Sequence, residues 1–341
     1  MCQLILLYLP FQNKIQMNYL KLIRPINLLV IIGTMCLFWY SFLVANGYKI
    51  FRLFPLMTNF QFFLLVFSTV CIAAGGYIIN DIYDTDIDTF NRPNRVIVGQ
   101  KISETTAYNF YKITCLISVI ATLTLAYLTK EYRLSTFPII IMVVLFFYAS
   151  MFKKQLILGN LTVAFCSAFT ILLISLFESG GNYLMGPNET AYRSSIFIGA
   201  LVYSLFAFLT TFIREIVKDI EDKVGDEQYD CKTIPIQFGD LTAKIVCLVF
   251  AFIIVSLLLT FVFFFIKMDI EKVPLFIILL LILPLVLIIS YLFIAKTVKQ
   301  MHIVSNLIKI YMVLGIASML YFSQGLSPIL INYVAFLKQL F

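Results

Sequence analysis

The sequence has little charge and almost no histidine. Only 13% of its 341 residues are charged, whereas 61% are apolar, and the mean hydropathy is +0.97. A soluble domain is typically about 25% charged and about 45–50% apolar, so this chain cannot cover a water-exposed globule with polar side chains. The shortage of charge therefore excludes a soluble globular protein and predicts one embedded in a lipid bilayer.

The single histidine, His302, and the scattered cysteines argue against several kinds of site. A lone histidine does not supply a His-based zinc site, and it argues against Ser-His-Asp catalysis. The seven cysteines lie mostly within apolar stretches, and no two of them form a C-x-x-C pair. The 34 Phe and 19 Tyr exclude a disordered chain. Any chemistry must therefore use other groups.

Apolar runs recur along the whole chain, and a membrane-spanning helix needs about 20 mostly apolar residues. Nine segments meet this requirement: 26–45, 60–79, 106–128, 135–152, 157–177, 195–213, 243–266, 273–295 and 306–325. We therefore expect an all-α membrane protein, a bundle of nine transmembrane helices. Residues 1–17 are expected to be a stub or upstream-start artefact, and 18–341 a single domain.

Lysine and arginine are distributed unevenly between alternate connections. One side of the predicted membrane carries 16 of these residues and the other carries 8. Because basic residues accumulate on the cytoplasmic side, we expect the N-terminus and the two most densely charged connections on that side of the cell (inner) membrane. The net charge of +7 then requires no nucleic acid partner.

Acidic residues gather in two connections, 80–91 and 214–231, which hold 11 of the 18 acids and each follow a predicted span. If the preceding helices continue, the members of each set share one helical face. The sets are Asn80, Asp84 and Asp88 in the first connection and Asp219, Asp222 and Asp226 in the second. Rows of carboxylates suit a hard cation, and Mg²⁺ commonly takes one or two carboxylates plus substrate phosphates. The pattern predicts a Mg²⁺ site for a diphosphate.

Basic residues lie beside these acids and in an intervening connection. They are Arg92, Arg95, Lys153, Lys154, Arg214 and Lys218. Guanidinium and ammonium groups bind phosphate oxygens that a metal leaves free. Each of them also serves as a positive-inside anchor, and for Lys154 the anchor interpretation is preferred.

The motifs resemble those of the intramembrane prenyltransferases of the UbiA superfamily, from about residue 18 onward. The family's N-D-x-x-D-x-x-x-D signature stands here as Asn80, Asp81, Asp84 and Asp88. Its second signature stands as Asp219, Asp222 and Asp226, followed by KTIPIQFG. Smaller similarities are RPIN at 24–27 and the set Tyr148, Lys153, Gly159 and Asn160.

The resemblance implies two four-helix halves plus one helix around a central cavity that opens to the membrane. In that cavity Mg²⁺ would join the two signatures to the diphosphate of a polyprenyl donor. The implied metal ligands are Asn80, Asp84, Asp88, Asp219 and Asp222, with catalytic support from Asp81 and Asp226. The implied diphosphate contacts are Arg92, Lys153 and Lys218, beside which Arg95 and Arg214 stand. Asn27, Tyr148 and Asn160 would face the acceptor or the prenyl chain.

The implied reaction transfers a polyprenyl group to a lipid-precursor or aromatic acceptor and releases diphosphate. The fragment REIVKDIEDKVGD is most similar to the branch that adds a second geranylgeranyl chain to geranylgeranylglyceryl phosphate. A hydroxybenzoate or naphthoate acceptor of quinone biosynthesis is the alternative, and haem farnesylation belongs to the same scaffold. Residues 95–99 read RVIVG where many relatives have R-P-x-P-S-G, which leaves the acceptor open.

A cation-coupled transporter is the alternative from another class, because intramembrane acids often mark ion pathways. Transport sites are commonly built from inverted repeats with broken helices. The two acidic connections are four predicted spans apart, which implies parallel halves. The spacing therefore favours the prenyltransferase.

Overall fold

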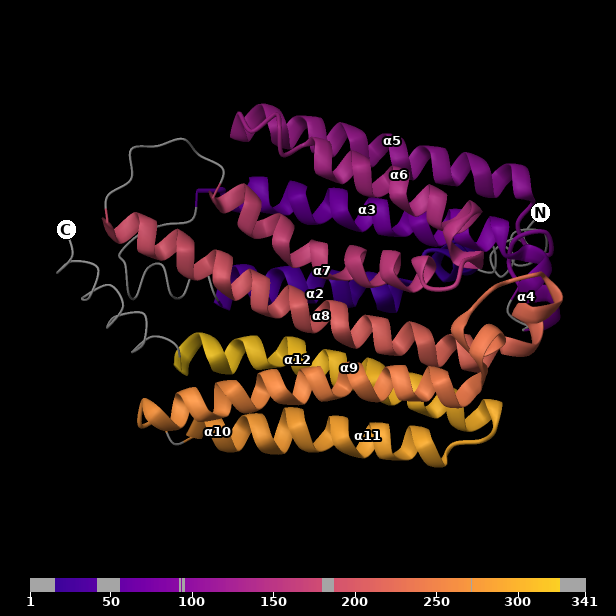
Figure 1. Cartoon of the computed structure of the whole chain (residues 1–341). Helices are drawn as coiled ribbons and strands as arrows, with labels where there is room; N and C mark the ends of the chain where they lie inside the picture. Colours follow the sequence, from indigo (N-terminus) through magenta and orange to yellow (C-terminus); the bar gives the residue numbers. More distant parts are fainter. Residues whose placement is uncertain are drawn as a thin grey trace, which may run out of the picture. The chain divides into compact units, whose positions relative to one another are not determined.

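The computed structural model describes residues 16–41, 56–91, 93, 96–179, 187–270 and 272–325. The regular structure in these ranges is helical, apart from one isolated bridge between Val98 and Ile102. The helices, labelled in Figure 1, are α2 (Pro25–Phe38), α3 (Asn59–Tyr83), α4 (Thr85–Asn91), α5 (Glu104–Thr129), α6 (Thr136–Ser150), η4 (Phe152–Lys154), α7 (Leu158–Ser179), α8 (Pro187–Gln228), α9 (Ile234–Lys267), α10 (Lys272–Ile277), η5 (Ile278–Ile282), α11 (Leu283–Ile294) and α12 (Val298–Gly325). A further helix covers Gln16–Leu22.

Seven of the described helices are long and apolar enough to cross a membrane, and an eighth span results if Gln16–Leu22 and Pro25–Ser41 are counted as one bent span. These two helices meet at 54°, because Pro25 has no N–H and Arg24 adopts a left-handed backbone with φ of 53°. The 15 residues of α6 extend only about 22 Å. The all-helical, multi-pass membrane architecture is therefore as predicted, while the exact count of nine spans is not confirmed.

The chain divides into two compact units. The first comprises Met1–Ile32, Asn59–Lys154 and Val224–Asp230; the second comprises Gly33–Thr58, Gln155–Lys223 and Cys231–Phe341. Most of the long helix α8 belongs to the second unit, whereas its last turn belongs to the first. We describe the contacts within each unit separately.

In the first unit, α3 packs against both α5 and α6, and the three helices lie side by side in Figure 1. Small residues allow the close approach: a Cβ at Gly76 would come within 2.9 Å of Leu145 Cδ1. Between α3 and α5, the hydroxyl of Ser68 lies 2.6 Å from that of Thr122. Interhelical hydrogen bonds of this kind stabilise helix pairs where lipid offers no polar partner.

An ordered apolar turn precedes α5. Val98 and Ile102 are buried and pack in a cluster with Ile78 and Ile82 of α3. Gly99 has φ of +80°, a conformation that favours glycine, and its N–H donates to the carbonyl of Ile102. Residues 96–99, VIVG, therefore form part of an apolar turn that packs against the end of α3.

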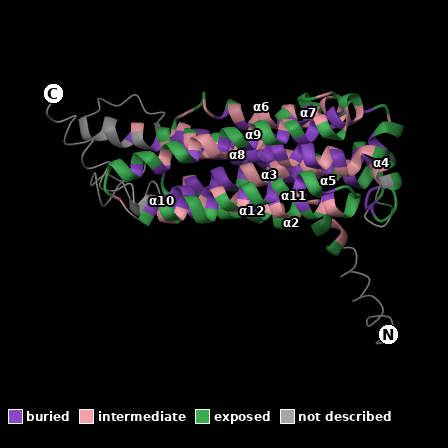
Figure 2. Cartoon of the chain, turned by 60° about the horizontal axis from the view of Figure 1, so that its bottom comes forward, coloured by how far each residue is buried: buried purple, intermediate pink, exposed green. Residues whose placement is uncertain are grey.

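In the second unit, α9, α11 and α12 pack around a buried apolar cluster, to which α8 also contributes. Figure 2 shows buried and exposed positions alternating around the helices. Many of the exposed residues are large and apolar, as expected for helices that face lipid. Near its start α9 is kinked at Gly239, whose φ is +84°. The predicted helix after 243 therefore begins earlier, at Ile234, with the kink dividing it.

At the end of α7, a buried carboxylate holds the chain that leads into α3. Glu178 is 2% exposed and accepts hydrogen bonds from the backbone N–H groups of Leu56 and Met57, at 2.9 and 3.0 Å. The buried Arg193 of α8 lies close enough to interact with its charge. All four residues belong to the second unit, so Glu178 ties three of its segments together.

Candidate active site

The first acidic segment continues the helical register of α3 across a single turn residue. The N–H of Asp84 donates to the carbonyl of Asn80 at 2.9 Å, and the N–H of Asp88 donates to the carbonyl of Asp84 at 2.8 Å. These i to i−4 hydrogen bonds keep the three residues on one face as α3 passes into α4. The predicted helical continuation is therefore confirmed for this segment.

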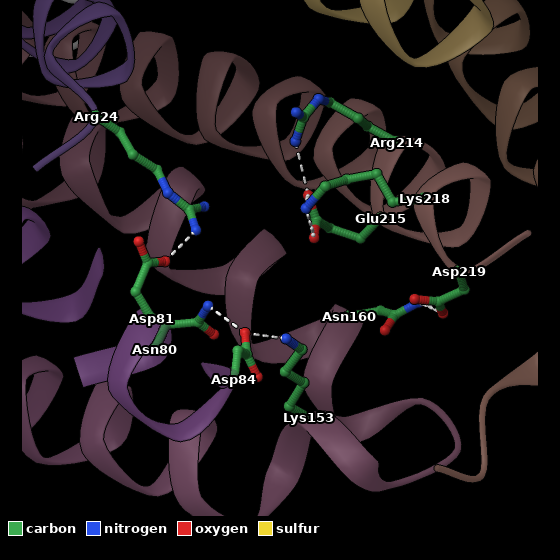
Figure 3. Close-up of polar contacts among 10 residues, drawn as sticks. All are labelled: Arg24, Asn80, Asp81, Asp84, Lys153, Asn160, Arg214, Glu215, Lys218 and Asp219. Atoms are coloured by element: carbon green, nitrogen blue, oxygen red, sulfur yellow. Dashed lines mark hydrogen bonds and ion pairs between the residues drawn. The ribbon is translucent and has the colours of Figure 1, made fainter. Parts of the chain in front are cut away.

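Asp84 lies at the centre of a polar cluster in the first unit, drawn in Figure 3. The residue is 3% exposed, and its Oδ2 accepts a hydrogen bond of 2.6 Å from Asn80 Nδ2. Lys153 Nζ forms an ion pair with the same oxygen. Burial acts to lower the pKa of Lys153, but the Asp84 carboxylate, Tyr148 and Asp88 together raise it by more, so the net pKa lies above the ordinary value. Lys153 is therefore a cation at any physiological pH.

The amide of Asn80 has a fixed orientation with a consequence for ligands. A carboxylate only accepts hydrogen bonds, so Asn80 must direct its NH₂ group at Asp84. Asn80 Oδ1 is then left buried and without a hydrogen-bond partner, which ordinarily costs about 1–3 kcal/mol. An unpaired amide oxygen beside a carboxylate is a suitable donor set for a hard cation.

Asp81, on the same helix, is bound elsewhere. Its Oδ1 lies 2.5 Å from Arg24 Nη2, and the Arg24 guanidinium stands over the ring of Tyr77 at 5.1 Å from the centroid. The motif predicted a catalytic role for Asp81, and Arg24 was not among the predicted site residues. The RPIN similarity was a signal for Arg24, but only the fold reveals its carboxylate partner.

The second acidic segment stands on one uninterrupted helix, because α8 continues to Gln228. Glu215 bridges two cations there: its Oε1 lies 2.8 Å from Arg214 Nη1, and its Oε2 lies 3.0 Å from Lys218 Nζ. Asn160 of α7 donates a hydrogen bond of 2.7 Å from Nδ2 to Asp219 Oδ2. Figure 3 includes these contacts, all of which lie within the second unit.

Glu215 was not among the predicted site residues, although it is the partner of two of them. Asn160 contacts a predicted metal ligand, whereas the sequence analysis placed it on the acceptor or prenyl side. Farther along α8, Glu221 lies 2.9 Å from Nδ1 of His302, the lone histidine. The one imidazole therefore pairs with a carboxylate next to the predicted ligand Asp222.

The last turn of α8 belongs to the first unit, together with α4. Asp226 is 9% exposed, and Tyr229 OH donates a hydrogen bond of 3.0 Å to the backbone carbonyl of Asp86. Asp222, one turn before Asp226, is half-buried. A direct hydrogen bond thus joins the end of the second acidic segment to the first.

The remaining predicted residues include two from the first unit, Asn27 and Tyr148. Asn27 is half-buried in α2, and Tyr148 is half-buried in α6, near enough to Lys153 to interact electrostatically with it. Arg92 and Arg95 lie outside the described residues. Across the part of the chain that the structure describes, no three acidic, cysteine or histidine side chains lie together as a ready metal site. The full predicted ligand set is therefore a prediction still to be tested.

Comparison with known proteins identifies the family. The UbiA prenyltransferase family model matches residues 35–313. The digeranylgeranylglyceryl phosphate synthase of Sulfurisphaera tokodaii is 31% identical over 221 residues, which are 65% of this chain and 69% of that protein. The synthase of the same name from Methanosphaera stadtmanae is 27% identical over 301 residues, or 88% of this chain and 97% of that protein.

Solved structures agree on the fold. A structure of digeranylgeranylglyceryl phosphate synthase superposes with a TM-score of 0.60 at 20% identity, covering 91% of this chain and 98% of the other. A UbiA homologue from Archaeoglobus fulgidus bound to DMAPP and Mg²⁺ superposes with a TM-score of 0.52 at 17% identity, covering 88% and 99%. With the family match spanning most of the sequence, the chain belongs to the UbiA prenyltransferase family.

Proposed function

We propose that this protein transfers a geranylgeranyl group from its diphosphate to geranylgeranylglyceryl phosphate, with release of diphosphate. The observation that carries the proposal is the buried cluster of Asn80, Asp84 and Lys153, which brings an amide oxygen, a carboxylate and a permanent cation together at the end of α3. The acceptor is proposed because relatives matching over up to 88% of the chain are digeranylgeranylglyceryl phosphate synthases.

Each part of the cluster has a task in such a transfer. Asn80 and Asp84 would hold Mg²⁺, with Asp88, Asp219 and Asp222 as the further proposed ligands. The bound ion supplies charge stabilisation for the diphosphate as the allylic C–O bond breaks. Lys153, Arg214 and Lys218 bind diphosphate oxygens, because ammonium and guanidinium groups form strong charge-assisted hydrogen bonds to phosphate.

The remaining acids act by positioning. Asp81 Oδ1 forms an ion pair with Arg24 at 2.5 Å. We therefore propose that Asp81 holds the bend at Arg24, just before α2, in contact with α3. The backbone carbonyl of Asp226 accepts a hydrogen bond from the N–H of Tyr229, so we assign Asp226 to supporting the turn in which Tyr229 binds Asp86. The proposal that both acidic segments serve one metal and diphosphate site rests on the family to which the chain belongs, and we propose that the site faces the cytoplasm, on the side rich in lysine and arginine.

Acceptor identity is tested by supplying the purified chain with labelled geranylgeranyl diphosphate, Mg²⁺ and one acceptor at a time. Geranylgeranylglyceryl phosphate is expected to give a lipid product heavier by one geranylgeranyl group, as measured by mass spectrometry. Hydroxybenzoate and naphthoate are the matched alternatives. A prenylated aromatic product without a lipid product would replace the proposed acceptor, and no product with any acceptor would refute the transfer.

Lys218→Gln is expected to raise the donor KM by about tenfold while the acceptor KM stays unchanged, because one charge-assisted contact to phosphate is lost. The variant also releases Glu215 from one of its two cations. Lys223→Gln is the matched control on the same helix, since Lys223 pairs with Asp240 at 2.7 Å. Equal donor KM values in the two variants would assign Lys218 to helix stability.

A further inference from the structure

The carboxylate proposed to bind Mg²⁺ already carries a cation. Asp84 Oδ2 accepts from Asn80 Nδ2 and pairs with Lys153 Nζ, while Oδ1 takes part in neither contact. Burying a lone carboxylate is costly, because it gives up its hydration without compensation. Lys153 therefore neutralises the charge of Asp84 in this structure.

A divalent cation on Asp84 would meet this ammonium at close range. Charges of the same sign repel strongly where protein, rather than water, surrounds them. Oδ2 also has two hydrogen-bond donors already. Simultaneous binding of Lys153 and a divalent cation to Asp84 is therefore unfavourable.

Lys153 is able to leave. It stands in the short η4 turn after α6, and its side chain keeps 29% of its surface exposed. Asp84 is its hydrogen-bond partner through a single oxygen. A lysine side chain is a flexible four-carbon stem with rotatable donors, so its ammonium can turn toward solvent or toward another anion nearby.

We infer that Lys153 is an exchangeable counter-ion, which neutralises Asp84 until a divalent cation takes its place. This inference rests on the proposed function, because it takes Asp84 as a metal ligand. Once displaced, the ammonium becomes available to the diphosphate that arrives with the metal. Metal and diphosphate then favour each other's binding, since each contributes to moving Lys153 off Asp84.

The test measures metal binding without any donor. Mn²⁺ is titrated into the purified full-length chain in detergent and followed by electron paramagnetic resonance. Lys153→Met removes the competing charge and is expected to lower the Mn²⁺ dissociation constant by about tenfold. Lys153→Gln removes the charge but leaves an amide that can donate to Asp84, and it replaces the first variant if that does not fold. Lys154→Met, in the same turn, is the control and should match the wild type.

The outcomes separate two ideas. Unchanged or weaker Mn²⁺ binding in the Lys153 variants would overturn the exchange, as would a wild-type chain that binds no Mn²⁺ by itself. Normal product formation alongside an unchanged titration would leave the proposed transfer intact. The variants could also bind Mn²⁺ more tightly while the wild type forms no prenylated product. That result would support competition between Lys153 and the metal at Asp84, but it would refute the proposed prenyl transfer.

Discussion

Asp84→Asn is expected to lower turnover by a factor of about one hundred or more. The change keeps the volume of the buried side chain, but it removes the negative charge and replaces one acceptor oxygen with an NH₂ donor. Lys153 pairs with that charge, and the proposed metal would need it when it takes the place of Lys153. The measurement is the initial rate of product formation with geranylgeranyl diphosphate at saturating Mg²⁺.

Asp86→Asn is the matched control for this prediction. Asp86 lies two residues away on α4 with an exposed side chain, and its contact to Tyr229 is made by the backbone carbonyl. We expect near wild-type turnover from it. If Asp84→Asn folds and retains more than a tenth of the wild-type rate, Asp84 is not an essential ligand.

Glu178→Ala is expected to destabilise the protein on the order of 2–4 kcal/mol without touching the proposed site. The substitution takes the acceptor away from the N–H groups of Leu56 and Met57, and Met57 is only 3% exposed. It also leaves the buried Arg193 without the carboxylate beside it. The measurement is the midpoint of unfolding in detergent.

The design of this second test separates stability from chemistry. Glu227→Ala, which removes an exposed carboxylate from α8, should leave the midpoint unchanged. Glu178→Gln keeps one acceptor oxygen and should lie between the wild type and Glu178→Ala. A Glu178→Ala protein as stable as the wild type would show that water or other groups satisfy these N–H groups equally well.

Periodicity along the sequence predicted the local geometry of the site well. The i, i+4 spacing of Asn80, Asp84 and Asp88 placed them on one face, and the backbone hydrogen bonds through Asp84 maintain that face. The continuation of α8 into the second segment was predicted in the same way. Both depend on the helical repeat alone, which neighbouring residues determine.

Partners distant in sequence could not be predicted from this repeat. Lys153 is 69 residues from Asp84, and Arg24 is 57 residues from Asp81, so no local spacing connects them. From the sequence, Lys153 was predicted to bind phosphate, and its carboxylate partner was not predicted. Span counting had a related limit, because a bend at Arg24 and a short α6 both interrupt the simple rule of about 20 apolar residues.

The unbroken course of α8 makes the second acidic segment sensitive to chain length. From Ile196 to Gln228 the helix runs for 33 residues, about 50 Å. One continuous series of backbone hydrogen bonds therefore connects the apolar span with the acidic segment. Each residue added to or removed from this helix rotates the residues that follow by about 100° around the helix axis. One insertion between Ile196 and Asp219 would rotate Asp219 and Asp222 away from their face, whereas a seven-residue insertion would nearly restore it. The face of the second acidic segment therefore tolerates a change in the length of this helix only in near-whole turns.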